Sequence, residues 1–295
     1  MDKTAVESKK SVRWWSDFNA LVKLRLSATV VFSSIMAYLI AYEGQVSAVG
    51  VLVLAGGGFF VTAAANILNE VLERDFDKLM KRTADRPIAA GRMDISNAVL
   101  IAGLMSMVGI TLLALFNPGT ALLGTIALMS YAFMYTPMKR LSPTAVTVGA
   151  VAGALPTLIG CVAAEGRVSL LGVTLFAIQF FWQYTHFWSI AYLGFEDYHK
   201  AGYQFLPQQN GKLSRSVGIQ AFVFAVCLIP TALVPYFLGI TGLISGILVA
   251  LLSLIFAYFA WNFYQQFDRK SALRLMFSSF VYIPMTLLIY FFDKV

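Results

Sequence analysis

Nine apolar stretches, each long enough to cross a membrane, recur along this 295-residue chain and limit the folds open to it. A helix needs about 20 mainly apolar residues to cross the bilayer core, where backbone groups must pair internally. Hydrophobic residues make up 59% of the chain and charged residues 13%, which excludes an ordinary soluble enzyme. We expect the spans at 26–44, 47–68, 96–116, 119–136, 143–163, 169–193, 216–236, 242–262 and 272–292.

Lysine and arginine are concentrated in alternate connections between these spans. The first 25 residues hold six, and the loops after the second, fourth, sixth and eighth spans hold six, two, three and three, of a total of 22. Because positive residues mark the cytoplasmic side, we expect these segments in the cytoplasm and the C-terminus outside. The predicted organisation is a cytoplasmic segment at 1–25 and a single transmembrane domain at 26–295. This pattern accounts for the net charge of +7, so no nucleic-acid partner is expected.

The acidic residues are concentrated at the end of the second span. A helix advances by about 100° per residue, so Asn66, Glu70, Glu73 and Asp77 would fall within about 60° of one another, with Asp75 nearly opposite. Adjacent carboxylates repel unless a cation lies among them. Mg²⁺ prefers such oxygen ligands and binds phosphates at the same time. The alternative interpretation is a solvated, salt-bridged helix end.

Basic residues and a second acidic pair accompany this stripe. Glu196 and Asp197 follow the sixth span on the same side of the membrane. Guanidinium and ammonium groups can bind the remaining phosphate oxygens. The candidates near the stripe are Arg74, Lys78, Lys81, Arg82 and Arg86. Together these residues predict a metal-bridged diphosphate at the cytoplasmic surface, and an apolar tail on that diphosphate would suit the surrounding bundle.

His186 lies deep in the sixth span, where an ionisable residue is a functional candidate. It could ligate a metal or act as an acid or base, or it could be a hydrogen-bonded packing residue. If the helix continues to Asp197, the two residues share a face about 16 Å apart, an arrangement that a break at Gly194 would remove. Aromatic residues could line a tail, stabilise a carbocation or only pack: Phe59, Phe60, Phe180, Phe181, Trp182, Phe187 and Trp188.

Several motifs, in order, resemble one known family. NEVLERDFD at 69–77 is similar to the NDxxDxxxD motif of UbiA-type intramembrane prenyltransferases. The resemblance is closer to the branch that farnesylates heme, the protoheme IX farnesyltransferases or heme O synthases, and covers about residues 20–290. Its motifs are LVKLRLSATVVFS (21–33), ERDFDKLMKRTADRP (73–87), YTPMKR (135–140), GALPTLIG (153–160), WQYTHFW (182–188) and EDYHKAGYQFLP (196–207).

The resemblance implies an all-α fold of nine transmembrane helices around a central cavity. It implies Mg²⁺-dependent transfer of farnesyl from farnesyl diphosphate to a vinyl group of heme b, with addition of water, which gives heme O and diphosphate. Besides these substrates and membrane lipid, it makes heme A synthase and terminal-oxidase assembly candidate partners. The expected location is a bacterial inner membrane.

The resemblance also assigns site residues. The expected catalytic residues are Asn69, Glu73, Asp77 and Asp197, and Glu70 joins them as a metal ligand. Glu73 and Glu70 depart from the family pattern, where Asp is usual at the first position and Asp or Asn is common at the second. The expected substrate-binding residues are Arg74, Arg82, Arg86, Lys139, Arg140, Trp182, His186, Glu196 and Lys200.

Two other functions remain open on the sequence. A related prenyltransferase could act on a quinone precursor or chlorophyllide. A heme or cation transporter is the alternative of another class. Transporters often contain internal repeats and broken helices at the membrane midplane, whereas this chain shows no convincing repeat and its acidic residues cluster at one end.

Overall fold

A computed structural model describes residues 14–295, so most of the expected N-terminal segment lies outside the described residues. Residues 14–21 are helical. The elements that follow are α2 (Leu24–Ala41), α3 (Ala48–Asp77), α4 (Ile95–Ala114), α5 (Pro118–Met129), η1 (Ser130–Tyr135), α6 (Thr136–Met138), α7 (Ala145–Glu165), α8 (Leu170–Leu193), α9 (Phe195–Lys200), β1 (Gln208–Gln209), β2 (Lys212–Leu213), α10 (Ser216–Thr231), α11 (Val234–Phe237), α12 (Leu243–Gln266) and α13 (Arg269–Phe292).

Each of the nine expected spans coincides with a helical segment, which confirms the predicted fold class. Within residues 14–295, eight segments are long and apolar enough to cross a membrane by composition alone. The remaining segment is α8, which carries Gln179, Gln183 and His186 among its aromatic residues. Its polar groups lower its hydropathy, and they lie inside the bundle.

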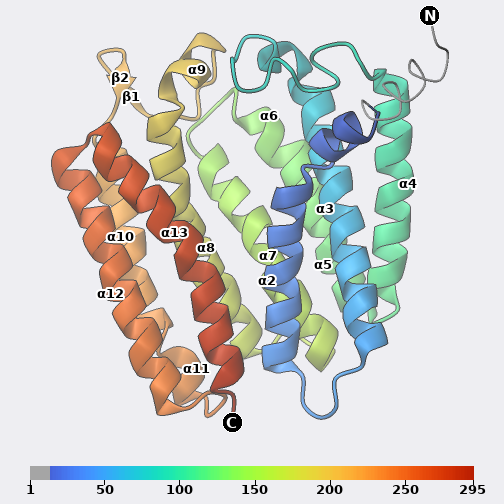
Figure 1. Cartoon of the computed structure of the whole chain (residues 1–295), viewed down its shortest axis with the longest axis vertical. Helices are drawn as coiled ribbons and strands as arrows, with labels where there is room; N and C mark the ends of the chain where they lie inside the picture. The colour runs from blue at the N-terminus through green and yellow to red at the C-terminus, as the bar shows by residue number, and fades with distance from the viewer. Residues whose placement is uncertain (1–13) are drawn as a thin grey trace, which may run out of the picture.

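The helices run side by side, with the loops alternating between the two ends of the bundle (Figure 1). Consecutive helices pack as neighbours in α3–α4, α7–α8 and α12–α13. The helix α2 packs mainly against α7, and α13 contacts α2 as well as α8 and α12. The last helix therefore lies beside the first described span. The loop after α3, the short α9 and the β1–β2 hairpin all lie at one end (Figure 1).

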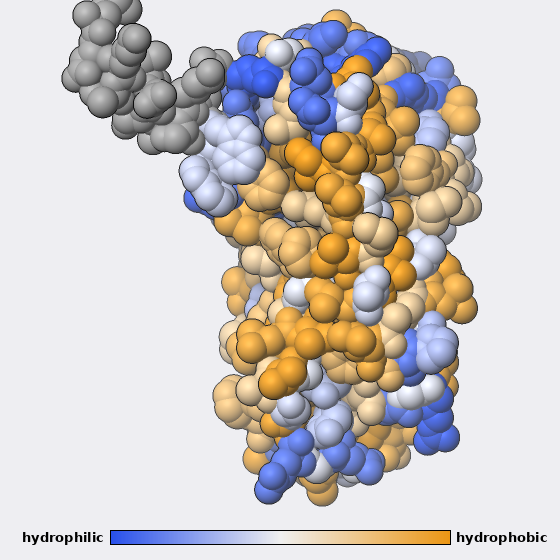
Figure 2. All heavy atoms as spheres, turned by 90° about the vertical axis from the view of Figure 1, so that its right-hand side faces the viewer, coloured by the Kyte–Doolittle hydropathy of each residue, from blue (hydrophilic) through white to orange (hydrophobic). Residues whose placement is uncertain are grey.

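The outer surface suits a membrane. Figure 2 shows a broad hydrophobic zone between hydrophilic ends. Exposed apolar side chains such as Leu52, Val108 and Phe277 contribute to this kind of surface. Inside, one apolar cluster contains Trp188 and Phe256. A second contains Leu54, Ile67 and Leu113.

Glycine allows a close approach between two helices, α2 and α7. A Cβ atom added to Gly160 of α7 would lie 2.1 Å from the backbone oxygen of Ser34 in α2. Small residues commonly let backbones approach at helix contacts within membranes. The contact fixes α2 against α7, beside the cavity described below.

The fourth span contains a π-helical turn, η1, before it ends in α6. The backbone N–H of Thr136 donates to the oxygen of Tyr131, five residues earlier, and the Thr136 hydroxyl donates to the same oxygen at 2.9 Å. Pro137, which has no N–H, follows directly. Turns of this kind are frequent at functional sites.

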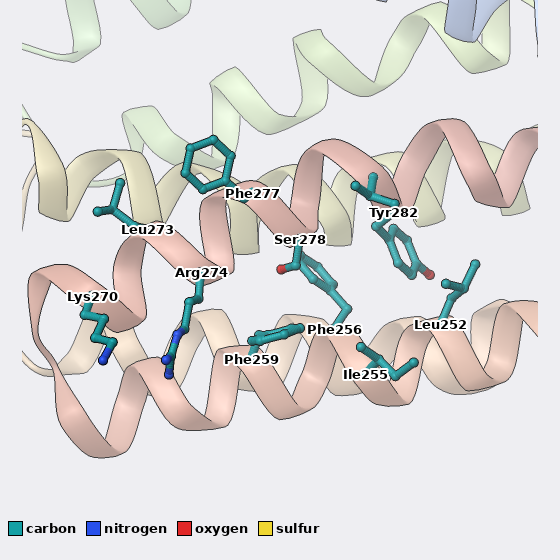
Figure 3. A pocket seen from close by; sticks show the side chains of 11 residues that line it. Leu252, Ile255, Phe256, Phe259, Lys270, Leu273, Arg274, Phe277, Ser278 and Tyr282 are labelled. Carbon is teal, nitrogen blue, oxygen red and sulfur yellow. The ribbon is translucent and has the colours of Figure 1, made fainter.

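A groove of about 570 Å³ lies between α12 and α13. Figure 3 shows aromatic and aliphatic side chains from both helices along it, including Phe256, Phe259 and Tyr282, with Lys270 and Arg274 near one end. Its lining residues differ from those of the cavity that contains His186. The groove is therefore separate from the candidate site.

Candidate active site

The last turns of α3 present a buried polar stripe at the end of the bundle that also bears α9. Asn66, Asn69, Glu70, Glu73 and Asp77 are each no more than 3% exposed. The Asp75 side chain is 64% exposed, so it lies on the other face. The helical spacing correctly predicted this division between the faces, while α3 continues nine residues beyond the expected span, to Asp77.

Three cations neutralise the stripe. Lys139 Nζ lies 2.5 Å from Glu73 Oε1, and Arg86 Nη1 lies 2.7 Å from Asp77 Oδ2. Arg86 Nε also lies 3.8 Å from Glu70 Oε1. Lys23, just before α2, donates to Asn69 Oδ1 at 3.0 Å. The charges of three carboxylates and three cations therefore balance without a ligand.

Burial alters the pKa of two of these cations, Lys23 and Arg86. Burial, together with the nearby charge of Arg86, lowers the pKa of Lys23 to about 7. Burial also opposes the charge of Arg86, but the neighbouring Asp77 carboxylate overcomes it, and the pKa of Arg86 is raised. The site therefore holds Lys23 as a weakly favoured cation beside a firmly charged guanidinium.

Several carboxylate oxygens remain without a hydrogen-bond partner among the described residues. They include both oxygens of Glu70 and Oδ1 of Asp77. Hard carboxylate oxygens are suitable ligands for Mg²⁺. Across residues 14–295, no three acidic, histidine or cysteine side chains are already arranged around one metal position, and two of the carboxylates of the stripe are in short ion pairs. The donor atoms thus fit Mg²⁺ chemically.

The π-helical turn and the following loop support the stripe. Asn69 Nδ2 donates to Thr136 Oγ1 at 3.0 Å and to Glu73 Oε2 at 2.9 Å. Lys139 Nζ lies 4.6 Å from the centroid of the Tyr135 ring. The backbone oxygen of Lys139 accepts from the N–H groups of Gln204 and Phe205. This joins the end of the fourth span to the loop that follows α9.

Not every predicted basic residue reaches the stripe. Arg74 pairs with the exposed Asp75 at 3.4 Å, on the outer face of α3. Arg140 donates to the backbone oxygen of Leu72, and its guanidinium lies 4.0 Å from the centroid of the Phe76 ring. Arg82 donates to the Tyr198 hydroxyl at 3.4 Å, which links the two polar loops.

The second acidic segment lies apart from the stripe. The helix α8 ends at Leu193, and Gly194 has non-helical angles (φ −101°, ψ 7°), so the continuous helix from His186 to Asp197 is not formed. Asp197 and Glu196 line a cavity of about 770 Å³ with Arg215. No described hydrogen bond or ion pair joins Asp197 to Asp77, and Lys200 is exposed.

A cavity of about 230 Å³ lies within the bundle and includes both Asn66, from the stripe, and His186. The His186 ring stacks on Trp182 with centroids 5.1 Å apart and an interplanar angle of 7°. Trp182 Nε1 donates to the backbone oxygen of Ser279 at 2.8 Å. Lining residues come from six of the nine spans, and they include Val30, Asn66, Tyr131, Gly153, His186 and Ile283.

Some site residues were not predicted from the sequence. Lys23 was counted only among the positive residues that predict the orientation in the membrane. Asn66 was placed on the stripe but was not among the expected metal ligands. Tyr131 and Gln183, which line the cavity, were not proposed. The need for cations among three carboxylates was a signal that pointed toward a partner such as Lys23. No comparable signal marked Tyr131.

The fold and site define a class: a polytopic membrane protein with a buried acidic and basic cluster at the end of an intramembrane cavity. Residues 30–282 match the UbiA prenyltransferase family. The chain belongs to the UbiA prenyltransferase family.

Similar proteins extend over nearly the whole chain. The protoheme IX farnesyltransferase of Cytophaga hutchinsonii is 39% identical, over 93% of this chain and 96% of the relative. That of Christiangramia forsetii is 40% identical, over 95% of this chain and 93% of the relative.

Solved structures share the fold at low identity. A digeranylgeranylglyceryl phosphate synthase has a TM-score of 0.79 at 18% identity, covering 95% of this chain and 98% of the other. A UbiA homolog from Archaeoglobus fulgidus bound to GPP and Mg²⁺ has a TM-score of 0.69 at 14% identity, covering 93% and 99%.

Proposed function

We propose that this chain transfers the farnesyl group of farnesyl diphosphate to a vinyl group of heme b, with addition of water, and so acts as a protoheme IX farnesyltransferase. The observation that carries the proposal is the near-full-length similarity to proteins of that name. The charge-balanced stripe beside an apolar cavity supports it, because a prenyl diphosphate has a charged head and an apolar tail.

The stripe is the proposed diphosphate site. Asn69, Glu70, Glu73 and Asp77 would hold Mg²⁺, which supplies positive charge to the leaving diphosphate. The unpaired oxygens of Glu70 and Asp77 support this role. Asp197 completes the ligand set only if α9 moves toward the stripe, since it lines a separate cavity here.

The basic residues neutralise the diphosphate as the carbon–oxygen bond breaks. Lys23, Arg86 and Lys139 now face carboxylate or amide oxygens, and an arriving phosphate offers them equivalent acceptors. Arg82, Arg140 and Lys200 are proposed to act in the same way from the loops, and the acidic Glu196 is proposed to bind substrate beside them. Arg74 has the weakest support in this set because it faces Asp75.

The cavity is the proposed place of carbon–carbon bond formation. The terminal carbon of the vinyl group attacks the farnesyl cation, which moves the positive charge to the carbon attached to the macrocycle. Aromatic faces in the cavity can stabilise such a charge. His186 and Trp182, held to Ser279, would orient the macrocycle.

The orientation in the membrane is also a proposal. Twenty of the 22 lysine and arginine residues fall in the N-terminal segment and in alternate loops. This distribution supports a stripe at the cytoplasmic side of a bacterial inner membrane, with the C-terminus outside. Heme A synthase and terminal-oxidase assembly remain candidate partners for the product.

Product identification tests the function. Purified protein with heme b, farnesyl diphosphate and Mg²⁺ should yield hydroxyethylfarnesyl heme by mass spectrometry, and a chelator should stop its formation. Prenylated quinone precursors or chlorophyllide in extracts of expressing cells, without any farnesylated heme, would replace this function with the related one.

A heme titration tests the cavity. His186→Ala should weaken heme binding, followed by the absorption spectrum. His199→Ala is the matched control, because His199 is an exposed histidine in α9. Equal affinities of the two variants and the wild type would remove His186 from heme binding.

A further inference from the structure

Two glutamines of α8 face the central cavity with unpaired acceptor oxygens. Gln179 and Gln183 both line it, and the Oε1 atom of each is buried without a hydrogen-bond partner among the described residues. Gln179 is only 7% exposed. A buried acceptor without a donor is costly, and it usually indicates a water or ligand that supplies the donor.

The fold makes room for one of these amides. Gln183 Nε2 donates to the backbone oxygen of Gly149 at 3.4 Å, which orients the amide and leaves Oε1 as the unpaired atom. A Cβ atom at Gly153 would lie 2.3 Å from both Nε2 and Oε1 of Gln183. The α7 helix therefore has a glycine where the Gln183 amide lies.

Two hydroxyl groups of the cavity already donate hydrogen bonds. Thr29 donates to the backbone oxygen of Arg25 at 3.0 Å, and Ser33 donates to that of Thr29 at 3.3 Å. Both bonds stay within α2. Among the described residues that line the cavity, the fully buried side-chain acceptors without a hydrogen-bond partner both lie on α8.

His186 adds a third acceptor to the same face of α8. The Ser279 hydroxyl donates its one proton to the backbone oxygen of Met276 at 2.5 Å. It must then accept the 2.6 Å bond from His186 Nδ1, so the proton of the neutral imidazole is assigned to Nδ1. Nε2 is left as the basic nitrogen. Gln179, Gln183 and His186 follow the i, i+4, i+7 spacing of one helix face.

We propose that Gln179 and Gln183 bind a water molecule in the cavity by accepting its two O–H groups, and that this water is the one added during the reaction. The inference rests on the proposed function and deepens it. Successive turns place the two side chains about 6 Å apart along the helix, a gap that one water can bridge. A water that donates both protons to amide oxygens presents its lone pairs to a cation.

The chemical step balances without a further reactant. A lone pair of the water oxygen forms a carbon–oxygen bond to the cationic carbon beside the macrocycle. The resulting oxonium loses one proton to Nε2 of His186, which leaves the alcohol. Without a held water, the same cation instead loses a proton from the neighbouring methylene carbon, which gives an alkene lighter than the alcohol by one water.

The test measures the ratio of alcohol to alkene in the farnesylated heme, by mass spectrometry in ordinary and heavy-oxygen water. The Gln179→Met, Gln183→Met double variant should raise the alkene share by about tenfold, the scale of losing one or two hydrogen bonds. Gly153→Ala should shift the ratio in the same direction, because it displaces the Gln183 amide without removing it.

Thr185→Val is the matched control. Thr185 is a buried polar residue of α8 that donates to the backbone oxygen of Ala221, and it does not line the cavity. Its product ratio should equal that of the wild type. If the double variant does not fold, the ratio of alcohol to alkene is measured in the single variants Gly153→Ala and Gln183→Met instead.

The outcomes separate the two proposals. A wild-type alcohol ratio in the glutamine and glycine variants would overturn the water site while leaving the farnesyltransferase function intact. A wild type that makes no farnesylated heme would overturn the function itself.

Discussion

The Asp77–Arg86 pair allows a sharp test of the stripe. Asp77→Asn keeps the size of the side chain and one acceptor oxygen but removes the charge that faces Arg86 at 2.7 Å. At an effective dielectric constant of about 20, that attraction is about 6 kcal/mol. Because the amide still accepts a hydrogen bond, the expected net loss of stability is about 1.5–3 kcal/mol. The corresponding drop in melting temperature is about 3–12 °C.

The same substitution should affect activity more than stability. Losing one charged ligand beside a leaving diphosphate is expected to reduce kcat/KM by about 10²–10³. Asp75→Asn is the matched control, since it removes the same charge two residues away on the exposed face. Steady-state assays and thermal unfolding in detergent give both quantities. A wild-type kcat/KM in Asp77→Asn, or an equal loss of kcat/KM in Asp75→Asn, would refute the assignment of the buried face of α3 as the diphosphate site.

Three further changes test other parts of the structure. Lys139→Met leaves the buried Glu73 without its partner at 2.5 Å, so farnesyl diphosphate should bind more weakly in equilibrium binding assays, whereas Lys270→Met, at an exposed position beside the separate α12–α13 groove, should bind normally. Gly160→Ala forces α7 from α2 and should cost about 1–3 kcal/mol in unfolding experiments; an unchanged melting temperature would contradict the close approach. Hydrogen bonds from Ser271 lower the pKa of Asp268, which caps the start of α13, below its ordinary value of 3.8, so the part of its stabilisation that depends on its charge is present at neutral pH and is lost as the pH falls through that lowered pKa. The difference in melting temperature between the wild type and Asp268→Ala should therefore shrink in strong acid.

The spans and the stripe were predictable because both follow from periodicity. Apolar length predicts each helix, and the helical repeat places Asn66, Glu70, Glu73 and Asp77 on one face. The side of the membrane that each loop occupies follows from charge, and it stays a prediction.

The partners of the stripe were less predictable because they depend on long-range packing. Lys23 reaches Asn69, 46 residues later, from a left-handed backbone conformation with φ of 48° that no local pattern indicates. Arg74 was expected at the diphosphate, but its neighbour Asp75 holds it on the outer face. The position of Asp197 depended on whether the chain stays helical through Gly194, and sequence alone left that open.

The π-helical turn at 130–135 also sets the rotational phase of the span's end. Such a turn is equivalent to one extra residue inside an α-helix. If the same residues were wound as a regular α-helix without this turn, everything beyond it would rotate by about 100°. Lys139 would then turn from Glu73, so homology models and loop grafts across this segment must keep the wide turn.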